Sequence, residues 1–225
     1  MIPKKIHYCW FGGNEMSHLS KRCMSSWEAF LPDYELTLWN ESNAPIEEPI
    51  VRHAIKNKMW AFAADYTRLH ALQKYGGIYL DTDMEIIKNL DHLLKGSEVL
   101  LGEESDGMIS AGIICATPNS NFISECIREM RRQFSMGKRF VTIPKIITKT
   151  YLDYAHKDRC KIYPPDYFYP YNPYDTNQPV KQLMHRDITP NTCTIHHWEN
   201  SWKQNFAKRA LNKARNSAIE WINKK

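Results

Sequence analysis

Two aspartates, Asp81 and Asp83, stand two residues apart directly after the short apolar run 78–80 (IYL). If that run is a buried strand continuing through the aspartates, residues i and i+2 point to one side, so both carboxylates lie together at a sheet edge. Paired carboxylate oxygens suit Mn²⁺ or Mg²⁺, and such an ion usually also takes phosphate oxygens. The pair therefore predicts a divalent-metal site, although a solvated strand end is the commoner explanation for an isolated Asp-Thr-Asp triplet.

A helix before the triplet carries a second charged pair. Apolar residues recur at helical spacing over 61–75, and Gly76-Gly77 ends the helix. Asp65 and Arg68 are three residues apart and hence on one face. The turn at the glycines folds the helix back beside the strand, where both side chains could reach the pocket of Asp81 and Asp83. An arginine there would offset the charge of a diphosphate, whereas the alternative is a surface ion pair.

The elements that must position these residues alternate along the chain. An alternation of strands and helices predicts an α/β domain with a mostly parallel central sheet and flanking helices. Pro45 and Pro49 bracket an expected loop, and 161–174 is too irregular for a long element. Strands are expected at 5–11, 34–39, 78–80, 84–87, 98–102, 113–116 and 192–196, and helices at 17–30, 61–75, 119–134, 145–154 and 202–221.

Composition indicates a soluble globular protein. The chain has 225 residues, 43% of them hydrophobic and 24% charged, which fits one domain, or a core domain with a small lobe. Its six cysteines form no CxxC pair and no zinc spacing, so they are expected to be buried free thiols in a reducing compartment. No signal core and no run of about 18 apolar residues is present, so we expect a cytoplasmic protein.

The net charge of +5 is concentrated in one terminal segment. Residues 203–225 carry +6, and the rest of the chain carries −1. A nucleic-acid-binding domain would spread its charge over the body, so no nucleic-acid partner is expected. The segment 202–225 is predicted to be a basic amphipathic helix. Two interpretations stay open: the helix lies on an anionic membrane surface, or it packs on the catalytic domain with its basic side solvated.

Two ordered blocks, residues 64–69 (ADYTRL) and 75–83 (YGGIYLDTD), resemble the sugar-binding "DXD" region of glycosyltransferase family 32. Residues 2–13 (IPKKIHYCWFGG) are similar to that family's opening strand, and 196–202 (HHWENSW) to its closing segment. Residues 161–170 (KIYPPDYFYP) look like a segment common in its bacterial members. The resemblance spans residues 2–202 and is densest at 61–87.

The resemblance implies a GT-A fold, which is a Rossmann-like α/β sandwich, over a catalytic domain at 1–201. It also implies Mn²⁺ or Mg²⁺ and a retaining transfer. The donor would be a UDP- or GDP-linked sugar, and the acceptor a saccharide or lipid-linked saccharide. Bacterial members act in capsular polysaccharide or lipopolysaccharide synthesis, which would place the enzyme in the cytoplasm or peripherally at the inner face of the cell membrane.

The resemblance also implies roles for the residues of the densest block. Asp83 would bind the metal directly, and Asp81 would hold ribose or sugar hydroxyls and reach the metal through water. Asp65 and Arg68 would hold the donor sugar and the diphosphate. Tyr79 would line the pocket.

The first and last blocks add four expected site residues. Trp10 would stack on the nucleotide base, which a flat indole suits, whereas a core tryptophan is the alternative. His197 would be a late metal ligand, with Asn200 as a further candidate, and Trp202 would close over the diphosphate. A packed or capping histidine pair is the competing explanation for His196 and His197.

The chain departs from the family on the acceptor side. Ile143 stands where many members have the glycine of a Gly-Pro pair, and 110–112 (SAG) lacks an Asn-Gly that is often found there. Acceptor identity therefore stays open. No protein nucleophile is evident. Three acids after an expected strand face either the acceptor or the sugar, or else form a solvated loop: Glu103, Glu104 and Asp106.

Two functions of other classes remain open. A metal-dependent phosphotransferase or nucleotidyltransferase would also use paired aspartates, but the chain shows no GxxxxGK[ST] phosphate loop. A non-catalytic protein that binds nucleotide sugars would share the donor pocket without turnover.

Overall fold

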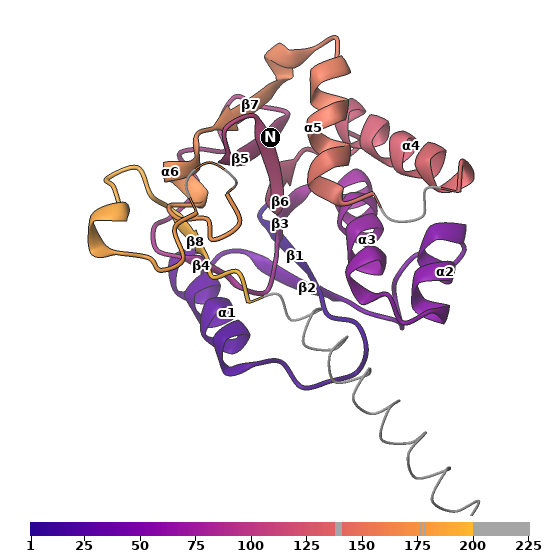
Figure 1. Ribbon diagram of the computed structural model, residues 1–225, viewed down its shortest axis with the longest axis horizontal. Helices are drawn as coiled ribbons and strands as arrows, with labels where there is room; N and C mark the ends of the chain where they lie inside the picture. Colours follow the sequence, from indigo (N-terminus) through magenta and orange to yellow (C-terminus); the bar gives the residue numbers. More distant parts are fainter. Residues whose placement is uncertain (138–140, 176, 178, 200–225) are drawn as a thin grey trace, which may run out of the picture.

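The computed structural model describes residues 1–137, 141–175, 177 and 179–199 (Figure 1). A six-stranded sheet with the order β2-β1-β3-β6-β5-β7 forms its centre, and β4 and β8 form a separate two-stranded sheet. The strands are β1 (Lys5–Cys9), β2 (Glu35–Trp39), β3 (Gly77–Leu80), β4 (Met84–Ile86), β5 (Val99–Ser105), β6 (Met108–Ala116), β7 (Cys160–Tyr163) and β8 (Thr194–His196).

The central sheet is mostly parallel, as the sequence predicts. β1 pairs parallel with β2 and β3, and β5 pairs parallel with β7. β6 pairs antiparallel with both β3 and β5, so five strands run one way and β6 runs against them. The carboxyl ends of β1, β3 and β5 therefore meet the start of β6 at one edge of the sheet, which is where α/β proteins bind ligands.

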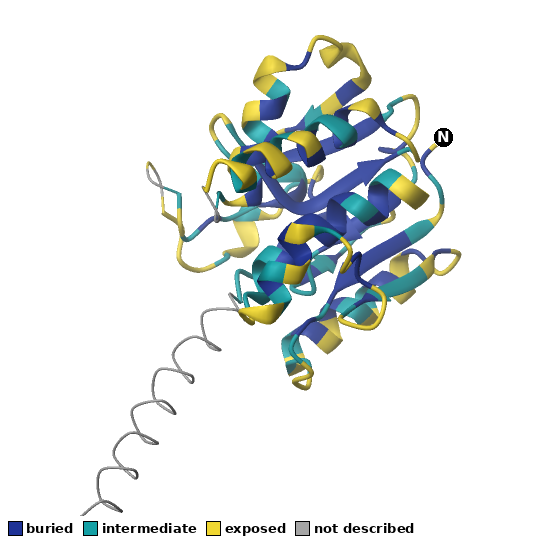
Figure 2. Cartoon of the chain, turned by 90° about the vertical axis from the view of Figure 1, so that its right-hand side faces the viewer, coloured by how far each residue is buried: buried dark blue, intermediate teal, exposed yellow. Residues whose placement is uncertain are grey.

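Both faces of the sheet are buried, and alternate residues of each strand serve different cores. In β3, Tyr79 packs with one core while Ile78 and Leu80 pack with the other. The same alternation separates Ile114 from Ile113 in β6. Figure 2 shows the resulting buried strands between their covering helices. This continuous apolarity is expected of strands that are covered on both sides.

The helices divide between the two faces (Figure 1). α3 packs on β1, β3 and β6, with α4 and α2 beside it, and α5 packs on β6 and α4. On the other face, α1 contacts β4, and α6 contacts β5 and β8. The helices are α1 (His18–Phe30), α2 (Pro49–Lys56), α3 (Trp60–Tyr75), α4 (Asn121–Ser135), α5 (Ile143–Asp153) and α6 (Pro165–Phe168), with short 3-10 turns η1 (Lys157–Arg159) and η2 (His185–Asp187).

Two glycines make the reversal from α3 into β3 possible. Gly76 and Gly77 have φ of +64° and +102°, which side chains rarely adopt. A Cβ at Gly76 would stand 2.6 Å from Pro118, and one at Gly77 would stand 2.6 Å from the carbonyl oxygen of Lys5. The tight turn lets α3 lie along the strand it precedes, as the site requires.

The structure contains short elements beyond those expected from the sequence. Residues 49–56 form α2, a helix that the sequence did not predict, whereas the loop expected between Pro45 and Pro49 is present. Pro49 occupies the first turn of the helix, where its missing N–H costs nothing. Cys160–Tyr163 forms β7 and Pro165–Phe168 forms α6, so the stretch 161–174 holds short elements and no long one, as expected. β6 is also longer than the expected strand at 113–116.

The expected C-terminal helix at 202–225, and with it the division from a catalytic domain at 1–201, lies outside the described residues. Within the described part of the chain, no helix combines the length and apolarity needed to cross a membrane.

Candidate active site

A cavity of about 570 Å³ opens at the edge of the sheet where β1, β3 and β5 end. Its walls also include the faces of α3 and the N-terminal turn of α5. Six of the residues expected at the site line it: Trp10, Asp65, Arg68, Tyr79, Asp81 and Asp83. The fold therefore brings residues that lie up to 73 positions apart in the chain to one cavity.

The Asp81–Asp83 segment forms a tight turn between β3 and β4, not the extended run that the sequence suggested. The N–H of Met84 donates to the carbonyl oxygen of Asp81 at 3.0 Å, and the N–H of Asp81 donates to the carbonyl oxygen of Gly112 at 2.8 Å. The turn reverses the chain so that β4 can pair with β8. Both carboxylates nevertheless line the cavity.

Arg68 braces the acidic side of the cavity from α3. Its Nη2 donates to Asp65 Oδ1 at 2.9 Å, and its Nη1 donates to Asp81 Oδ1 at 3.1 Å and to the carbonyl oxygen of Ala111 at 2.8 Å. The Tyr79 hydroxyl donates to the same Asp81 oxygen at 2.9 Å, and the guanidinium lies 4.4 Å from the centre of the Tyr79 ring. The two charged pairs expected from the sequence thus form one connected network.

Burial and charge act against each other in this network. Burial raises the pKa of Asp65 to about 6, although Arg68 opposes the shift and the N–H of Ile143 stabilises the carboxylate. Burial alone would lower the pKa of Arg68, but the negative charges of Asp81 and Asp65 raise it on balance. The guanidinium therefore keeps its charge, and Asp65 is the group that would yield by taking a proton.

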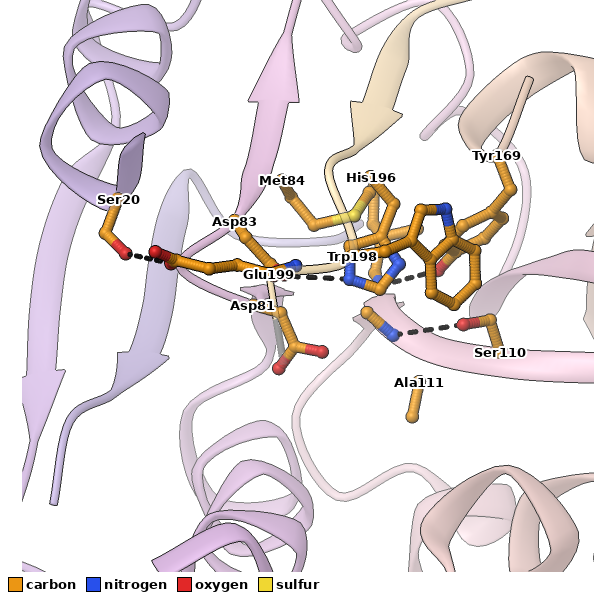
Figure 3. A network of polar contacts seen from close by, with 12 residues as sticks. Ser20, Asp81, Asp83, Met84, Ser110, Ala111, Tyr169, His196, Trp198 and Glu199 are labelled. Atoms are coloured by element: carbon orange, nitrogen blue, oxygen red, sulfur yellow. Dashed lines mark hydrogen bonds and ion pairs between the residues drawn. The ribbon is translucent and has the colours of Figure 1, made fainter. Parts of the chain in front are cut away.

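The C-terminal strand brings a histidine to Asp83. Met84 pairs with His196 across β4 and β8, and His196 Nε2 lies 3.2 Å from Asp83 Oδ1. The N–H of Glu199 donates to Asp83 Oδ2 at 2.9 Å (Figure 3). The Glu199 carboxylate accepts hydrogen bonds from Ser17 and Ser20 at the start of α1. Residues far apart in the sequence therefore converge on Asp83.

Ligand atoms of Asp81, Asp83 and His196 all lie within 4.8 Å of one another. Two carboxylates and one imidazole are a donor set that Mn²⁺ accepts. Burial would raise the pKa of Asp83, but His196 beside it lowers it on balance, and Asp83 in turn raises the pKa of His196 against the effect of burial. The residues present thus fit a divalent cation.

The structure places His197 elsewhere. Its Nε2 lies 2.7 Å from Glu85 Oε2, and only its main-chain N–H contacts Asp83, through the carbonyl oxygen at 3.0 Å. Consecutive residues of a strand point to opposite sides, so only one of the two histidines can face Asp83. That one is His196, which sequence reasoning weighed only as half of a packed pair. The expected roles of Asn200 and Trp202 lie outside the described residues.

Trp10 forms the wall of the cavity at the β1 end. Its side chain is half-buried and its Nε1 donates to the carbonyl oxygen of Asn14 at 2.6 Å. Gly12 follows with φ of +97°, and a Cβ there would stand 2.7 Å from Trp60 Nε1, so the turn brings two indoles to the same end of the cavity. Trp10 is absent from both buried clusters of the described residues, which argues against the core-tryptophan alternative.

Residues 17–100 match the family model "Glycosyltransferase sugar-binding region containing DXD motif". This part of the chain is similar to the DXD region of glycosyltransferases. The match contains Asp65, Arg68, Tyr79, Asp81 and Asp83, so the DXD region supplies the braced acidic network described above. The resemblance noted from the sequence is confirmed.

A curated relative and two solved structures are also similar to this chain. The lactosylceramide 4-alpha-galactosyltransferase of Rattus norvegicus is 27% identical over 121 residues, which are 48% of this chain and 31% of that protein. The PaToxG glycosyltransferase shares the fold with a TM-score of 0.58 at 20% identity, covering 68% of this chain and 69% of that one. The galactosyltransferase LgtC, solved with donor and acceptor sugar analogs, has a TM-score of 0.50 at 14% identity, covering 88% of each chain.

The two solved structures confirm the expected GT-A fold. The glycosyltransferase class rests on the family model, which matches residues 17–100. The matched part of the chain covers less than a third of the rat relative's length.

The lining of the cavity also contains both departures from the family pattern. Ser110–Gly112 and Ile143–Lys145 line the cavity, together with Glu104. Of the three acids considered for the acceptor side, Glu103 and Asp106 do not line the cavity, although both belong to the described part of the chain. The sequence alone does not show which of these three acids faces the cavity, because their orientation depends on an irregular stretch at the end of β5.

Proposed function

We propose that this protein is a metal-dependent, retaining glycosyltransferase that moves a sugar from a UDP- or GDP-linked donor to a saccharide or lipid-linked saccharide. The observation that carries the proposal is the convergence of Asp81, Asp83 and His196 in a cavity whose acidic wall is the DXD region. A cavity of about 570 Å³ is large enough for a small-molecule ligand of this kind.

Asp81, Asp83 and His196 would hold Mn²⁺ or Mg²⁺. A divalent cation neutralises the charge that develops on a departing diphosphate. His197, Asn200 and the closing role of Trp202 remain predictions from the family resemblance.

Side chains along the cavity would determine where each part of the donor binds. Trp10 at the β1 end would stack on the base, and the metal-binding residues at the end of β3 would face the diphosphate. Asp65 and Arg68 would hold the sugar: Arg68 mainly by fixing the carboxylates of Asp65 and Asp81, since it bonds both. Retention rests on the family resemblance, which implies that the acceptor attacks from the side of the leaving group.

The site favours transfer over the other classes considered. A phosphotransferase would be expected to bind phosphates with a glycine-rich loop, whereas carboxylate and indole side chains line this cavity. A cytoplasmic location is supported by the six free, buried cysteines, which suit a reducing compartment. The role in surface polysaccharide synthesis rests on the family resemblance. The basic segment 202–225 would then hold the enzyme at the anionic inner face of the membrane, next to a lipid-linked acceptor.

The test is a panel of UDP-galactose, UDP-glucose, UDP-N-acetylglucosamine and GDP-mannose incubated with the full chain and MnCl₂, with EDTA as the matched control. A transferase slowly hydrolyses its donor to free sugar and nucleoside diphosphate, and EDTA stops the reaction. Release of nucleoside monophosphate and sugar phosphate would instead identify cleavage within the diphosphate and refute the proposal. Donor-induced thermal stabilisation without any turnover, even with added glycosides, would indicate a non-catalytic binder. The anomeric configuration of the product, read by NMR, tests retention.

A further inference from the structure

The cavity has a second acidic group, Glu104, that the metal-binding cluster does not use. Strands β1, β3, β6 and β5 lie in this order across the sheet, and Trp10 follows β1 while Asp81 follows β3. Glu104 stands near the end of β5, so it lies beyond the metal cluster on the side away from Trp10. If the base binds at Trp10 and the diphosphate at the metal cluster, the end that Glu104 lines receives the sugar being transferred and its acceptor.

An irregularity in the sheet turns Glu104 toward this end. Glu103 pairs with Ile109 and Ser105 pairs with Met108, so β5 advances by two residues while β6 advances by one. Glu104 is therefore the extra residue of a β-bulge, a feature that re-aims a side chain and is common beside active sites. The carbonyl oxygen of Glu104 accepts a hydrogen bond from Asn172 Nδ2 at 3.0 Å, and Asn172 is buried, so the bulge is anchored from a second segment.

The surroundings of the Glu104 carboxylate leave it able to bind a hydroxyl group. Ser110 hydrogen-bonds it, and the charges of His196 and Asp81 act on it from the metal cluster. A carboxylate offers about four lone-pair positions, so one hydroxyl partner leaves acceptor capacity. Glu104 is half-buried, and this burial raises the pKa of its carboxyl group.

We propose that Glu104 is a sugar-binding residue, whose carboxylate accepts a hydrogen bond from a saccharide hydroxyl at the end of the cavity away from Trp10. The proposal rests on the proposed transferase function for the direction in which the substrate lies. The hydroxyl belongs either to the transferred sugar or to the acceptor, and the chemistry of recognition is the same in both cases. The neighbouring Glu103 does not line the cavity and provides a matched control.

The experiment compares Glu104→Gln, Glu104→Asp and the control Glu103→Gln in the full chain. Calorimetry measures affinity for the nucleoside diphosphate alone and for the nucleotide sugar, both with Mn²⁺. Steady-state assays measure donor hydrolysis, and transfer to a panel of p-nitrophenyl glycosides. Unfolding temperatures show whether a variant is merely destabilised. If Glu104→Gln is destabilised, Glu104→Asp serves as the folded variant that tests the proposal.

We expect Glu104→Gln to leave affinity for the nucleoside diphosphate unchanged and to lower one sugar-dependent quantity by about 10- to 100-fold, the loss typical of a hydrogen bond to a charged group. A loss of nucleotide-sugar affinity and of donor hydrolysis assigns the hydroxyl to the donor. A raised KM for the glycoside, with donor hydrolysis intact, assigns it to the acceptor. Glu104→Asp should recover part of the loss, and Glu103→Gln should behave as the wild type.

Three results would overturn the proposal. Glu104→Gln could behave like Glu103→Gln, or it could lose affinity for the nucleoside diphosphate that carries no sugar. It could also show the same defect with every substrate, in proportion to its loss of thermal stability. Failure of the transferase function is distinguishable, because the wild type would then show no turnover with any donor. The ratio of nucleotide-sugar to nucleotide affinity would still decide the case, and a ratio unaffected by Glu104→Gln would reject the residue's role.

Discussion

Replacement of Arg68 by methionine probes the network that holds the acidic wall together. Arg68 and Asp65 have side chains only 6% and 10% exposed, and the guanidinium makes three hydrogen bonds. Methionine keeps most of the volume but leaves the Asp65 carboxylate without its cation and the carbonyl oxygen of Ala111 without its donor. Breaking a buried ion pair from one side costs about 3–5 kcal/mol.

The expected loss in the free energy of unfolding lies near the lower limit of this range, about 3 kcal/mol. Asp65 can become neutral by taking up a proton, and Asp81 keeps the hydrogen bond from Tyr79. In a protein of this length, 1 kcal/mol corresponds to roughly 2–4 °C in Tm, so Arg68→Met should lower Tm by about 6–12 °C. The matched control is Arg128→Met, which breaks the i,i+3 pair with Glu125 on an exposed surface. It should change stability by less than about 0.5 kcal/mol.

The pH dependence of the loss identifies its origin. The pKa of Asp65 is about 6 in the folded protein and near 3.8 in the unfolded chain, so its ionisation costs stability above pH 6, and the cost is relieved as pH falls from 6 towards 3.8. Without Arg68 the folded-state pKa rises further, so relief begins at a higher pH. The difference in Tm between Arg68→Met and the wild type should therefore be smaller at pH 5.5 than at pH 8.

Thermal unfolding in EDTA, followed by circular dichroism at both pH values, measures this difference. The double variant Arg68→Met/Asp65→Asn, which has no buried carboxylate at position 65, should recover part of the stability at pH 8. A Tm change below 2 °C, or a change that is equal at both pH values, would refute the reasoning.

Three further substitutions test the site. Loss of a group that only supports a metal ligand typically lowers metal affinity by roughly 10- to 100-fold, and Asp83→Asn should lower Mn²⁺ affinity, measured by calorimetry, by more than this. The exposed control Asp158→Asn should leave Mn²⁺ affinity unchanged. Trp10→Ala should weaken nucleoside diphosphate binding by roughly 5- to 150-fold at little cost in Tm, and unfolding instead would mean that the residue is structural. His196→Ala should weaken Mn²⁺ binding much more than His197→Ala; the reverse order would restore the sequence-based choice.

Local patterns in the sequence were enough to predict most of the framework. The apolar spacing of 61–75 and the glycines after it correctly predicted α3 and its reversal into β3, because helix and turn both depend on neighbouring residues. The same spacing rule missed α2, which is only eight residues long and begins at Pro49. Pro49 marks the end of the expected loop, although a proline at the first turn leaves a helix intact.

The limit of sequence reasoning appears where distant strands set the geometry. His196 and His197 are adjacent, and only the pairing of Met84 with His196 decides which of them turns toward Asp83. That pairing joins residues more than one hundred positions apart, and a shift of one residue would exchange the two histidines. Glu104 is a similar case, because the bulge that orients it is a property of two strands together.

The hydrogen bonds of Asp81 show what Arg68 does in the acidic wall. The guanidinium already bonds protein groups, so it has little room left for a substrate. Arg68 and Tyr79 both donate to Oδ1 of Asp81. Oδ2 takes no hydrogen bond from the described side chains, so it keeps its lone pairs for a ligand. Two donors on one oxygen fix the rotation of the carboxylate and draw its charge toward α3, where Asp65 already sits. Without the Arg68 cation, Asp65 and Asp81 would repel each other across the same wall. Arg68 therefore acts by holding two carboxylates in place, so the geometry of the metal site should depend on Arg68 even though Arg68 binds no metal.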